Sequence, residues 1–155
     1  MEKELIISSH QGTVEIALLE NKKLVELHKQ KSNTHYNVGD IFLGTVRKLM
    51  PGLNAAFVDI GHSKEAFLHY TDMGPVLNSV KKYTHEVIHG IHTSSGLEHF
   101  EIQPEIHKNG KVSQVLEKKN LLLVQILKEP ISTKGHRLSC EITIPGRFIV
   151  LTPFS

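Results

Sequence analysis

The segment from Val38 to His69 contains three short strand patterns separated by tight turns, and it constrains the fold more than any other part of the chain. The first pattern begins at Ile41 and repeats with a period of two, which is typical of a strand rather than a helix. Pro51 and Gly52 then begin a turn, because proline fixes φ and glycine tolerates a positive φ. Strands this closely spaced predict a small antiparallel barrel rather than a βαβ unit. The three expected strands are 41–48, 55–60 and 65–69, with turns at 51–54 and 61–64.

Two phenylalanines in this segment indicate a ligand-binding face. Phe57 lies on the second expected strand and Phe67 on the third, and in a five-stranded Greek-key barrel these two strands bind single-stranded nucleic acid. Aromatic rings give bases a surface to stack on, while cationic side chains neutralise the phosphates. The nearby basic residues that complete the candidate face are Lys48, Lys64 and His69.

The alternative is that both rings belong to the core, which burial preferences favour for an arbitrary phenylalanine on a strand. Phe57 shares its strand face with Asp59, whereas Val58 shares the opposite face with Ile60. A face that carries an aspartate suits a core less than a face of valine and isoleucine does. We therefore expect Phe57 to point outward, and we expect Phe67 to be partly covered by the long segment that follows its strand.

A family resemblance rests on longer runs of residues. The run GDIFLGTVRKLMPGLNAAFVDIG at 39–61, followed by AFLH at 66–69, resembles the S1-type RNA-binding domain of the ribonuclease E/G family of bacterial endoribonucleases. The N-terminal run ELIISSHQGTVEIALLENKKLVELHKQK is similar to the opening strands of that family. The run ITIPGRFIVLTP at 142–153 resembles the family's segment after the barrel, so only 72–119 is without a counterpart.

The resemblance implies a mainly β fold with a five-stranded OB-fold barrel of the S1 type. The barrel would be flanked by strands of an incomplete RNase H-like subdomain, expected at 5–8, 14–20 and 24–28 and too few to form an independent sheet. The implied domains are 1–37 for these strands and a linker, 38–143 for the barrel with a long helical and loop insertion at 70–119, and 144–155 for the start of a 5′-sensor region.

The last two barrel strands frame a loop with a candidate RNA contact. We expect strand four at Asn120–Leu127 and strand five at His136–Ile142. Lys134 lies in the loop between them, which is one of the two loops that such barrels use to hold nucleic acid. A lysine of the matching loop contacts RNA in the family, so the resemblance assigns RNA contact to Lys134; a merely solvated lysine is the alternative.

The insertion suggests a helix at 76–90 and a strand at 99–102. Its histidines His85, His89 and His92 have the spacing of metal ligands on one helical face, but Gly90 would end the helix before the third of them. We therefore predict no metal site.

The resemblance also implies a function for the longer protein. We expect this chain to be a fragment of a cytoplasmic hydrolase, an endoribonuclease that cleaves single-stranded RNA in rRNA processing and mRNA decay. In the family, the aspartates that bind the Mg²⁺ cofactor lie in a later subdomain, so no catalytic residue is assigned here and the fragment is predicted to bind RNA without cutting it. Gly146 and Val150 match part of the family's 5′-phosphate sensor pocket. A homo-oligomer of the whole enzyme stays open.

Composition limits these readings. A formal net charge of +2 is too small to indicate a nucleic-acid binder, so a basic surface must come from the arrangement of the 18 lysines and arginines. The single cysteine, Cys140, excludes an intrachain disulfide. The chain has no apolar run of about 18 residues, and we expect no membrane partner. The alternative function is a stand-alone S1-type module of a translation or transcription factor, which would need neither the N-terminal strands nor the segment at 142–153.

Overall fold

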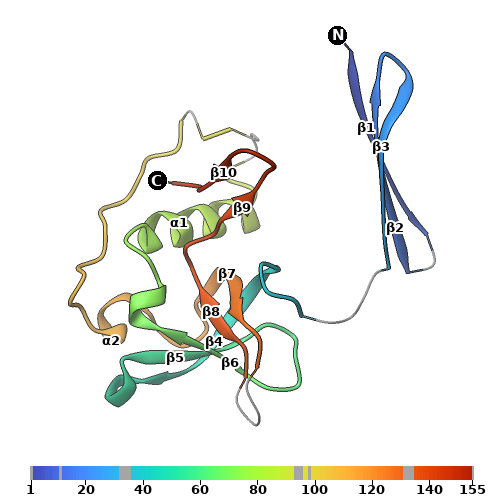
Figure 1. Cartoon of the computed structure of the whole chain (residues 1–155). Helices are drawn as coiled ribbons and strands as arrows, with labels where there is room; N and C mark the ends of the chain where they lie inside the picture. Colours follow the sequence, from blue (N-terminus) through green and yellow to red (C-terminus); the bar gives the residue numbers. More distant parts are fainter. Residues whose placement is uncertain are drawn as a thin grey trace. The chain divides into compact units, whose positions relative to one another are not determined.

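The chain forms two compact units, Met1–His35 and Tyr36–Ser155, in a computed structural model that describes residues 2–10, 12–31, 36–92, 96–97, 99–130 and 135–154 (Figure 1). The boundary between the units lies two residues before the expected start of the barrel at Val38.

The first unit is an antiparallel sheet of three strands, β1 (Lys3–His10), β2 (Thr13–Glu20) and β3 (Lys23–Lys31), with β2 in the centre. Asn21 and Lys22 join β2 to β3 with φ of 48° and 64°, the paired positive values of a two-residue hairpin turn. The expectation that these strands are too few for a sheet of their own is therefore wrong, because in the described part of the chain they pair with one another along their whole length.

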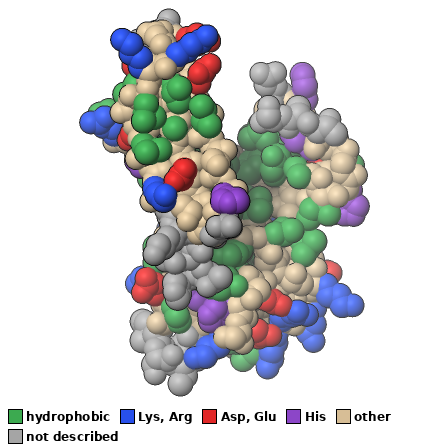
Figure 2. Space-filling view, turned by 90° about the vertical axis from the view of Figure 1, so that its right-hand side faces the viewer, with side chains coloured by type: hydrophobic (Ala, Val, Ile, Leu, Met, Phe, Trp, Pro, Cys, Tyr) green, Lys and Arg blue, Asp and Glu red, His purple; other side chains and the backbone are tan. Residues whose placement is uncertain are grey.

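Large apolar side chains lie on both faces of this sheet. Leu5 opposes Leu18 on one face, and Ile6 opposes Ala17 on the other. Figure 2 shows hydrophobic side chains gathered over one of these faces. Within this unit no second layer covers them, so each face presents exposed apolar surface. The apolar residues of the unit that are more than half exposed are Leu5, Ile6, Ile7, Leu24, Val25 and Leu27.

The second unit is built on a closed barrel in the order β4-β5-β6-β8-β7. Its neighbouring strands are antiparallel, except that β6 and β8 run parallel. A five-stranded barrel with this Greek-key order confirms the mainly β fold class and the OB-type barrel expected from the sequence. The RNase H-like nature of the first unit stays a prediction. The barrel strands are β4 (Ile41–Met50), β5 (Ala55–Asp59), β6 (Ala66–His69), β7 (Leu121–Lys128) and β8 (Arg137–Ser139).

Alternation along the strands decides which side chains fill the barrel. Ala56 and Val58 of β5 point inward, and so do Leu122, Val124 and Ile126 of β7. Gly44 of β4 faces the same interior, where a Cβ at this position would lie 2.5 Å from Val58 Cγ1. A glycine at position 44 therefore lets β4 approach the two valine-bearing strands closely.

The insertion contributes a turn of 3-10 helix, η2 (Tyr70–Asp72), and two helices, α1 (Leu77–Ile88) and α2 (Val112–Val115). The helix predicted at 76–90 matches α1, whereas the strand predicted at 99–102 is wrong. Side chains of α1 bind that segment instead: Lys82 Nζ donates to the Glu101 carbonyl at 3.2 Å, and Ser79 Oγ accepts from the Gln103 N–H at 2.9 Å. These two bonds satisfy the Glu101 carbonyl and the Gln103 N–H without a neighbouring strand.

The chain leaves the barrel earlier than predicted. The expected strand at 136–142 is only β8, because the Cys140 N–H donates to the Asp72 carbonyl at 2.9 Å instead of continuing the ladder. A small hairpin follows, formed by β9 (Ile144–Pro145) and β10 (Val150–Leu151). Another 3-10 turn, η1 (Pro51–Leu53), occupies the predicted turn at 51–54. Of the helices in the described residues, none has the length and apolarity needed to span a membrane.

Candidate nucleic-acid interface

Four side chains stand opposite one another across four strands on the outer face of the barrel. Lys48 of β4 pairs with Phe57 of β5, Phe57 with Phe67 of β6, and Phe67 with Arg137 of β8. Their neighbours Ala56 and Leu68 point into the core, so alternation turns these four outward. We call Lys48, Phe57, Phe67 and Arg137 the platform row: two aromatic rings with a cation at each end.

The two rings of the platform row are half-buried and in contact. Their centroids lie 5.9 Å apart with an interplanar angle of 68°, an edge-to-face pair. Both rings are partly buried, and the covering of Phe67 by the insertion stays a prediction. Each ring keeps an accessible surface on which a planar base can stack.

His69 extends the aromatic surface along β6. Its ring lies 6.4 Å from that of Phe67 at an angle of 27°, a stacked arrangement. The ring is held from the far side, where His69 Nδ1 lies 2.7 Å from Thr71 Oγ1 and accepts from the Thr71 N–H at 3.2 Å. Three rings thus run from the centre of the barrel face toward η2.

Arg137 is the member of the platform row that the sequence analysis missed. Its guanidinium donates to both carboxylate oxygens of Asp72, Nε to Oδ2 at 2.8 Å and Nη2 to Oδ1 at 3.2 Å. This pairing with Asp72 raises the pKa of Arg137 and fixes the group beside Phe67. Only the parallel pairing of β6 with β8 brings Arg137 there, and no short-range signal in the sequence shows that pairing.

A carboxylate at the edge of this face is neutralised by its neighbours. A bulge between Val46 and Lys48 frees Arg47 from the ladder, and its Nε donates to Asp59 Oδ2 at 3.1 Å. The Gly61 N–H donates to Asp59 Oδ1 at 2.8 Å. The Gly61 bond, followed by that from Arg47, lowers the pKa of Asp59. The negative charge therefore stays paired instead of repelling a phosphate chain.

The remaining predicted RNA contacts lie off the platform row. Lys64 is exposed on the turn between β5 and β6, where its N–H donates to His62 Nδ1 at 3.2 Å. Lys134 lies outside the described residues. A Cβ on the neighbouring Gly135 would lie 2.0 Å from the Glu65 carbonyl oxygen, so the Gly135 backbone lies close against the residue that precedes β6.

Gly146 and Val150, predicted as part of a 5′-phosphate sensor, lie in the β9–β10 hairpin. The Gly146 N–H donates to the Ile149 carbonyl at 2.7 Å, which closes the turn, and Val150 pairs with Pro145. Both residues are exposed. Their positions follow from the hairpin itself, and a phosphate-binding role stays a prediction.

The predicted histidine spacing brings two rings together without a third ligand. His85 and His89 stack on α1 with centroids 4.1 Å apart, while the ring of His92 packs edge-on against Tyr83 at 5.2 Å. In the ranges that the structure describes, no three His, Cys, Asp or Glu side chains form a group that could hold a metal ion.

No protein-family model matches the chain. Curated relatives do match it. It is 39% identical over 125 residues to the Ribonuclease E/G-like protein of Porphyra purpurea, covering 80% of this chain and 19% of that protein. It is 31% identical over 153 residues to Ribonuclease G of Escherichia coli K12, covering 99% of this chain and 27% of the relative. It is 35% identical over 121 residues to Ribonuclease E of a Nostoc species, covering 77% of this chain and 14% of that protein.

The chain thus spans between 14% and 27% of the length of these three relatives. The matches agree on one family although they come from three different organisms. The closed five-stranded barrel agrees with the fold that the resemblance implies. The chain belongs to the ribonuclease E/G family.

Proposed function

We propose that this chain is an RNA-binding part of a ribonuclease E/G-type endoribonuclease and that single-stranded RNA crosses the outer face of its barrel. The observation that supports this most directly is the platform row, in which two outward rings stand between Lys48 and Arg137. The relatives named as ribonucleases support RNA as the partner.

The platform row suits a flexible single strand better than a duplex. Unpaired bases can stack on Phe57 and Phe67, each stacking contact contributing roughly 1–3 kcal/mol, whereas the bases of a duplex have no free face. Lys48 and Arg137 lie at the ends of the row, where phosphates flanking the stacked bases would pass. Lys64, Lys134 and His69 complete the proposed RNA surface.

For the whole protein we propose an endoribonuclease that cleaves single-stranded RNA in rRNA processing and mRNA decay, in the cytoplasm and with Mg²⁺ as cofactor. In the described residues of this chain, no three His, Cys, Asp or Glu side chains form a group that could hold a metal ion. The family resemblance implies that the Mg²⁺ ligands belong to another subdomain. Gly146 and Val150 would contribute to 5′-phosphate sensing. The first unit would form part of an RNase H-like subdomain, and the whole enzyme would assemble into a homo-oligomer.

A stand-alone S1-type module is the competing proposal. The match with Ribonuclease G runs over 99% of this chain, so it includes the N-terminal strands and the β9–β10 hairpin as well as the barrel. A free-standing barrel needs neither of these segments. Their inclusion in the match favours the ribonuclease proposal.

Binding and cleavage can be tested separately with the 155-residue chain. We expect fluorescence anisotropy to report binding of a labelled single-stranded RNA and weaker binding of the same sequence as a duplex. We expect the single strand to stay intact on a denaturing gel after incubation with Mg²⁺. Equal binding of the duplex would contradict the stacking surface, and reproducible cleavage by purified protein would contradict the division between recognition and catalysis.

A further inference from the structure

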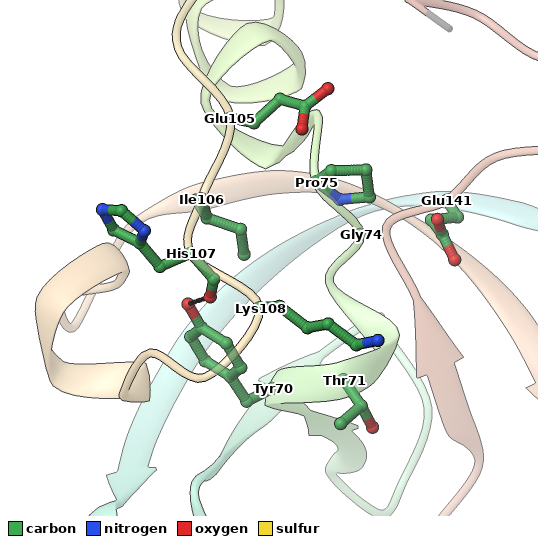
Figure 3. A pocket seen from close by; sticks show the side chains of 9 residues that line it. All are labelled: Tyr70, Thr71, Gly74, Pro75, Glu105, Ile106, His107, Lys108 and Glu141. Carbon is green, nitrogen blue, oxygen red and sulfur yellow. Dashed lines mark hydrogen bonds between the residues drawn. The ribbon is translucent and has the colours of Figure 1, made fainter.

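Beyond His69 the second unit contains an open pocket of about 650 Å³ that no role given above uses (Figure 3). Pockets that hold small ligands measure about 300–1,000 Å³, so the volume is adequate for a nucleotide. We call it the side pocket. Its lining comes from η2, from Gly74 and Pro75, from the insertion segment 105–108 and from Glu141.

The wall formed by the insertion is held against the barrel by hydrogen bonds. The Tyr70 hydroxyl donates to the His107 carbonyl at 2.7 Å, and the Ile106 N–H donates to the Pro75 carbonyl at 3.0 Å. Gly110 permits this contact, because a Cβ there would lie 2.1 Å from the Tyr70 hydroxyl oxygen. The pocket is therefore formed before any ligand arrives, which lowers the ordering cost of binding.

The opposite wall is set by Gly74 and Glu141. Gly74 has a φ of 70°, and a Cβ on it would lie 2.2 Å from Glu141 Cγ. The Cys140 N–H donates to the Asp72 carbonyl next to this contact. A glycine at 74 thus lets the Glu141 side chain lie along the pocket wall, with its carboxylate available to a ligand.

The side pocket continues the aromatic surface. Thr71 lines the pocket and also holds the His69 ring at 2.7 Å. The rings of Phe57, Phe67 and His69 follow one another at 5.9 and 6.4 Å. An RNA strand that stacks along these rings toward η2 therefore arrives at the mouth of the pocket.

The chemistry of the lining fits a nucleotide better than a phosphate alone. Figure 3 shows Lys108 extending toward Thr71, while Glu105 and Glu141 stand on other walls. Two carboxylates against one ammonium group disfavour a free anion. Carboxylates accept hydrogen bonds from base amino groups, as glutamate does from cytosine N4. Pro75 and Ile106 supply apolar surface for a base ring.

We propose that the side pocket holds one unpaired nucleotide of the RNA strand that crosses the platform row and selects a base that carries an amino group. Glu105 or Glu141, which stand on separate walls, accepts a hydrogen bond from that amino group, Pro75 and Ile106 contact the ring, and Lys108 faces the adjoining phosphate. This inference rests on the proposed RNA-binding function and adds a sequence preference to it, since single-stranded RNA is read through the edges of splayed-out bases.

The test compares hexacytidylate with hexauridylate, whose bases differ by an amino group in place of a carbonyl. We expect the wild-type chain to bind hexacytidylate about tenfold more tightly by anisotropy. Glu105→Ala and Glu141→Ala together should remove that preference, because no side-chain acceptor is left for the amino group. Glu117→Ala, just before the turn that leads into β7 and outside the pocket, is the matched control and should keep it. Lys108→Gln should flatten the log–log salt dependence by about 0.7 for one lost phosphate contact, whereas Lys118→Gln should not.

The outcomes separate this inference from the proposed function. Equal binding of the two homopolymers by the wild type, or a preference that survives the double variant, would overturn the side pocket as a base-selecting site while leaving RNA binding intact. Failure of the wild type to bind either RNA would overturn both. Circular dichroism melts of each variant show whether a lost preference reflects a lost fold, and trimers of the same bases, too short to span the rings and the pocket, should show no preference.

Discussion

At the residue scale, the platform row combines packing with accessibility. Phe57 and Phe67 contact each other edge to face and are half-buried, so each contributes both to the barrel surface and to a stacking site. Truncating such a ring removes less buried area than truncating a core phenylalanine. The effect on RNA binding and the effect on stability should therefore separate in measurement.

We expect Phe57→Ala and Phe67→Ala each to weaken binding of single-stranded RNA by roughly 1–3 kcal/mol. The loss of folding stability should stay below the roughly 3–5 kcal/mol typical of a buried phenylalanine. Anisotropy titrations beside thermal melts measure the two quantities. Phe148→Ala is the control, since that ring is 86% exposed in the hairpin, and it should change neither. A collapsed melt with either platform variant would assign that ring to the core.

His136 is the residue whose protonation should matter most for stability. It is 3% exposed, and its Nδ1 has no hydrogen-bond partner within the described part of the chain. The rings of Tyr36 and His62 contact it, with centroids at 5.6 and 4.9 Å. Burial, followed by the charge of His62, lowers the pKa of His136 below 6.5, although a hydrogen bond with the Tyr36 backbone and the charge of Glu129 act in the opposite direction.

The unfolded chain binds this proton more readily than the folded chain does. The contribution of neutral His136 to the free energy of unfolding is therefore complete above pH ~6.5 and is lost as the pH falls toward the lower pKa of the folded state. Urea unfolding at pH 7.5 and pH 5.5, two values about one unit either side of the ordinary histidine pKa, should show lower stability at the acidic value. His136→Gln should reduce that difference, whereas His28→Gln, on the exposed surface of β3, should preserve it. An unchanged pH dependence in His136→Gln would contradict this assignment.

At the element scale, one side chain joins the β4–β5 corner to the insertion. Asn54 follows η1 in a left-handed conformation with a φ of 47°. Its amide Nδ2 donates to the Gly110 carbonyl at 3.0 Å, and its Oδ1 accepts from the Val112 N–H at 2.7 Å. The two bonds use both ends of the amide, so neither aspartate nor leucine can replace it.

Asn54→Asp should keep the conformation and the bond to Val112 but lose the donor to Gly110. We expect it to destabilise the second unit by about 1–3 kcal/mol, because a carbonyl is left facing a carboxylate. Asn54→Gly should tolerate the left-handed backbone conformation but lose both hydrogen bonds. Its stability therefore separates the contribution of the hydrogen bonds from that of the conformation. Chemical denaturation measures each change. Equal stability of Asn54→Asp and the wild type would show that the amide bridge contributes nothing.

The elements that the sequence predicted well are those with local signals. The three strands around Pro51–Gly52 and the helix at 76–90 follow from turn residues and periodicity. The segment at 99–102 was misassigned because its partners are side chains of α1, more than ten residues upstream. The sequence indicated Phe57 and Phe67 as a pair, but Arg137 joined the platform row only through the parallel β6–β8 pairing. The Asn54 bridge and the side pocket likewise depend on contacts across the long insertion.

At the scale of the whole molecule, the two units differ in how well they cover their apolar residues. The barrel encloses a continuous core, whereas the three-stranded sheet exposes Leu5, Ile7 and Leu27 by about 60% each: 63%, 62% and 59%. The platform row and the side pocket both belong to the second unit. RNA binding should therefore need only that unit.

A chain starting at Tyr36 should melt cooperatively and bind single-stranded RNA with an affinity within about threefold of the complete chain, a difference under ~1 kcal/mol. It should also elute with less self-association in size-exclusion chromatography, because the exposed sheet faces are gone. The complete chain carrying Leu5→Lys and Ile7→Lys provides the comparison. Loss of RNA binding in the shortened chain would show that the first unit contributes to the interface.

Cys140 is a natural probe of local opening in this barrel. The chain has one cysteine; its side chain is fully buried at the end of β8, and burial raises the pKa of the thiol to about 12. A disulfide reagent reacts with the thiolate, so labelling must wait until the end of β8 separates from η2. The labelling rate in native buffer then reports the frequency of that local opening. RNA that binds beside β8 should slow this labelling reaction. The labelling rate of the natural Cys140 thiol would then report how much of the barrel face is occupied by RNA.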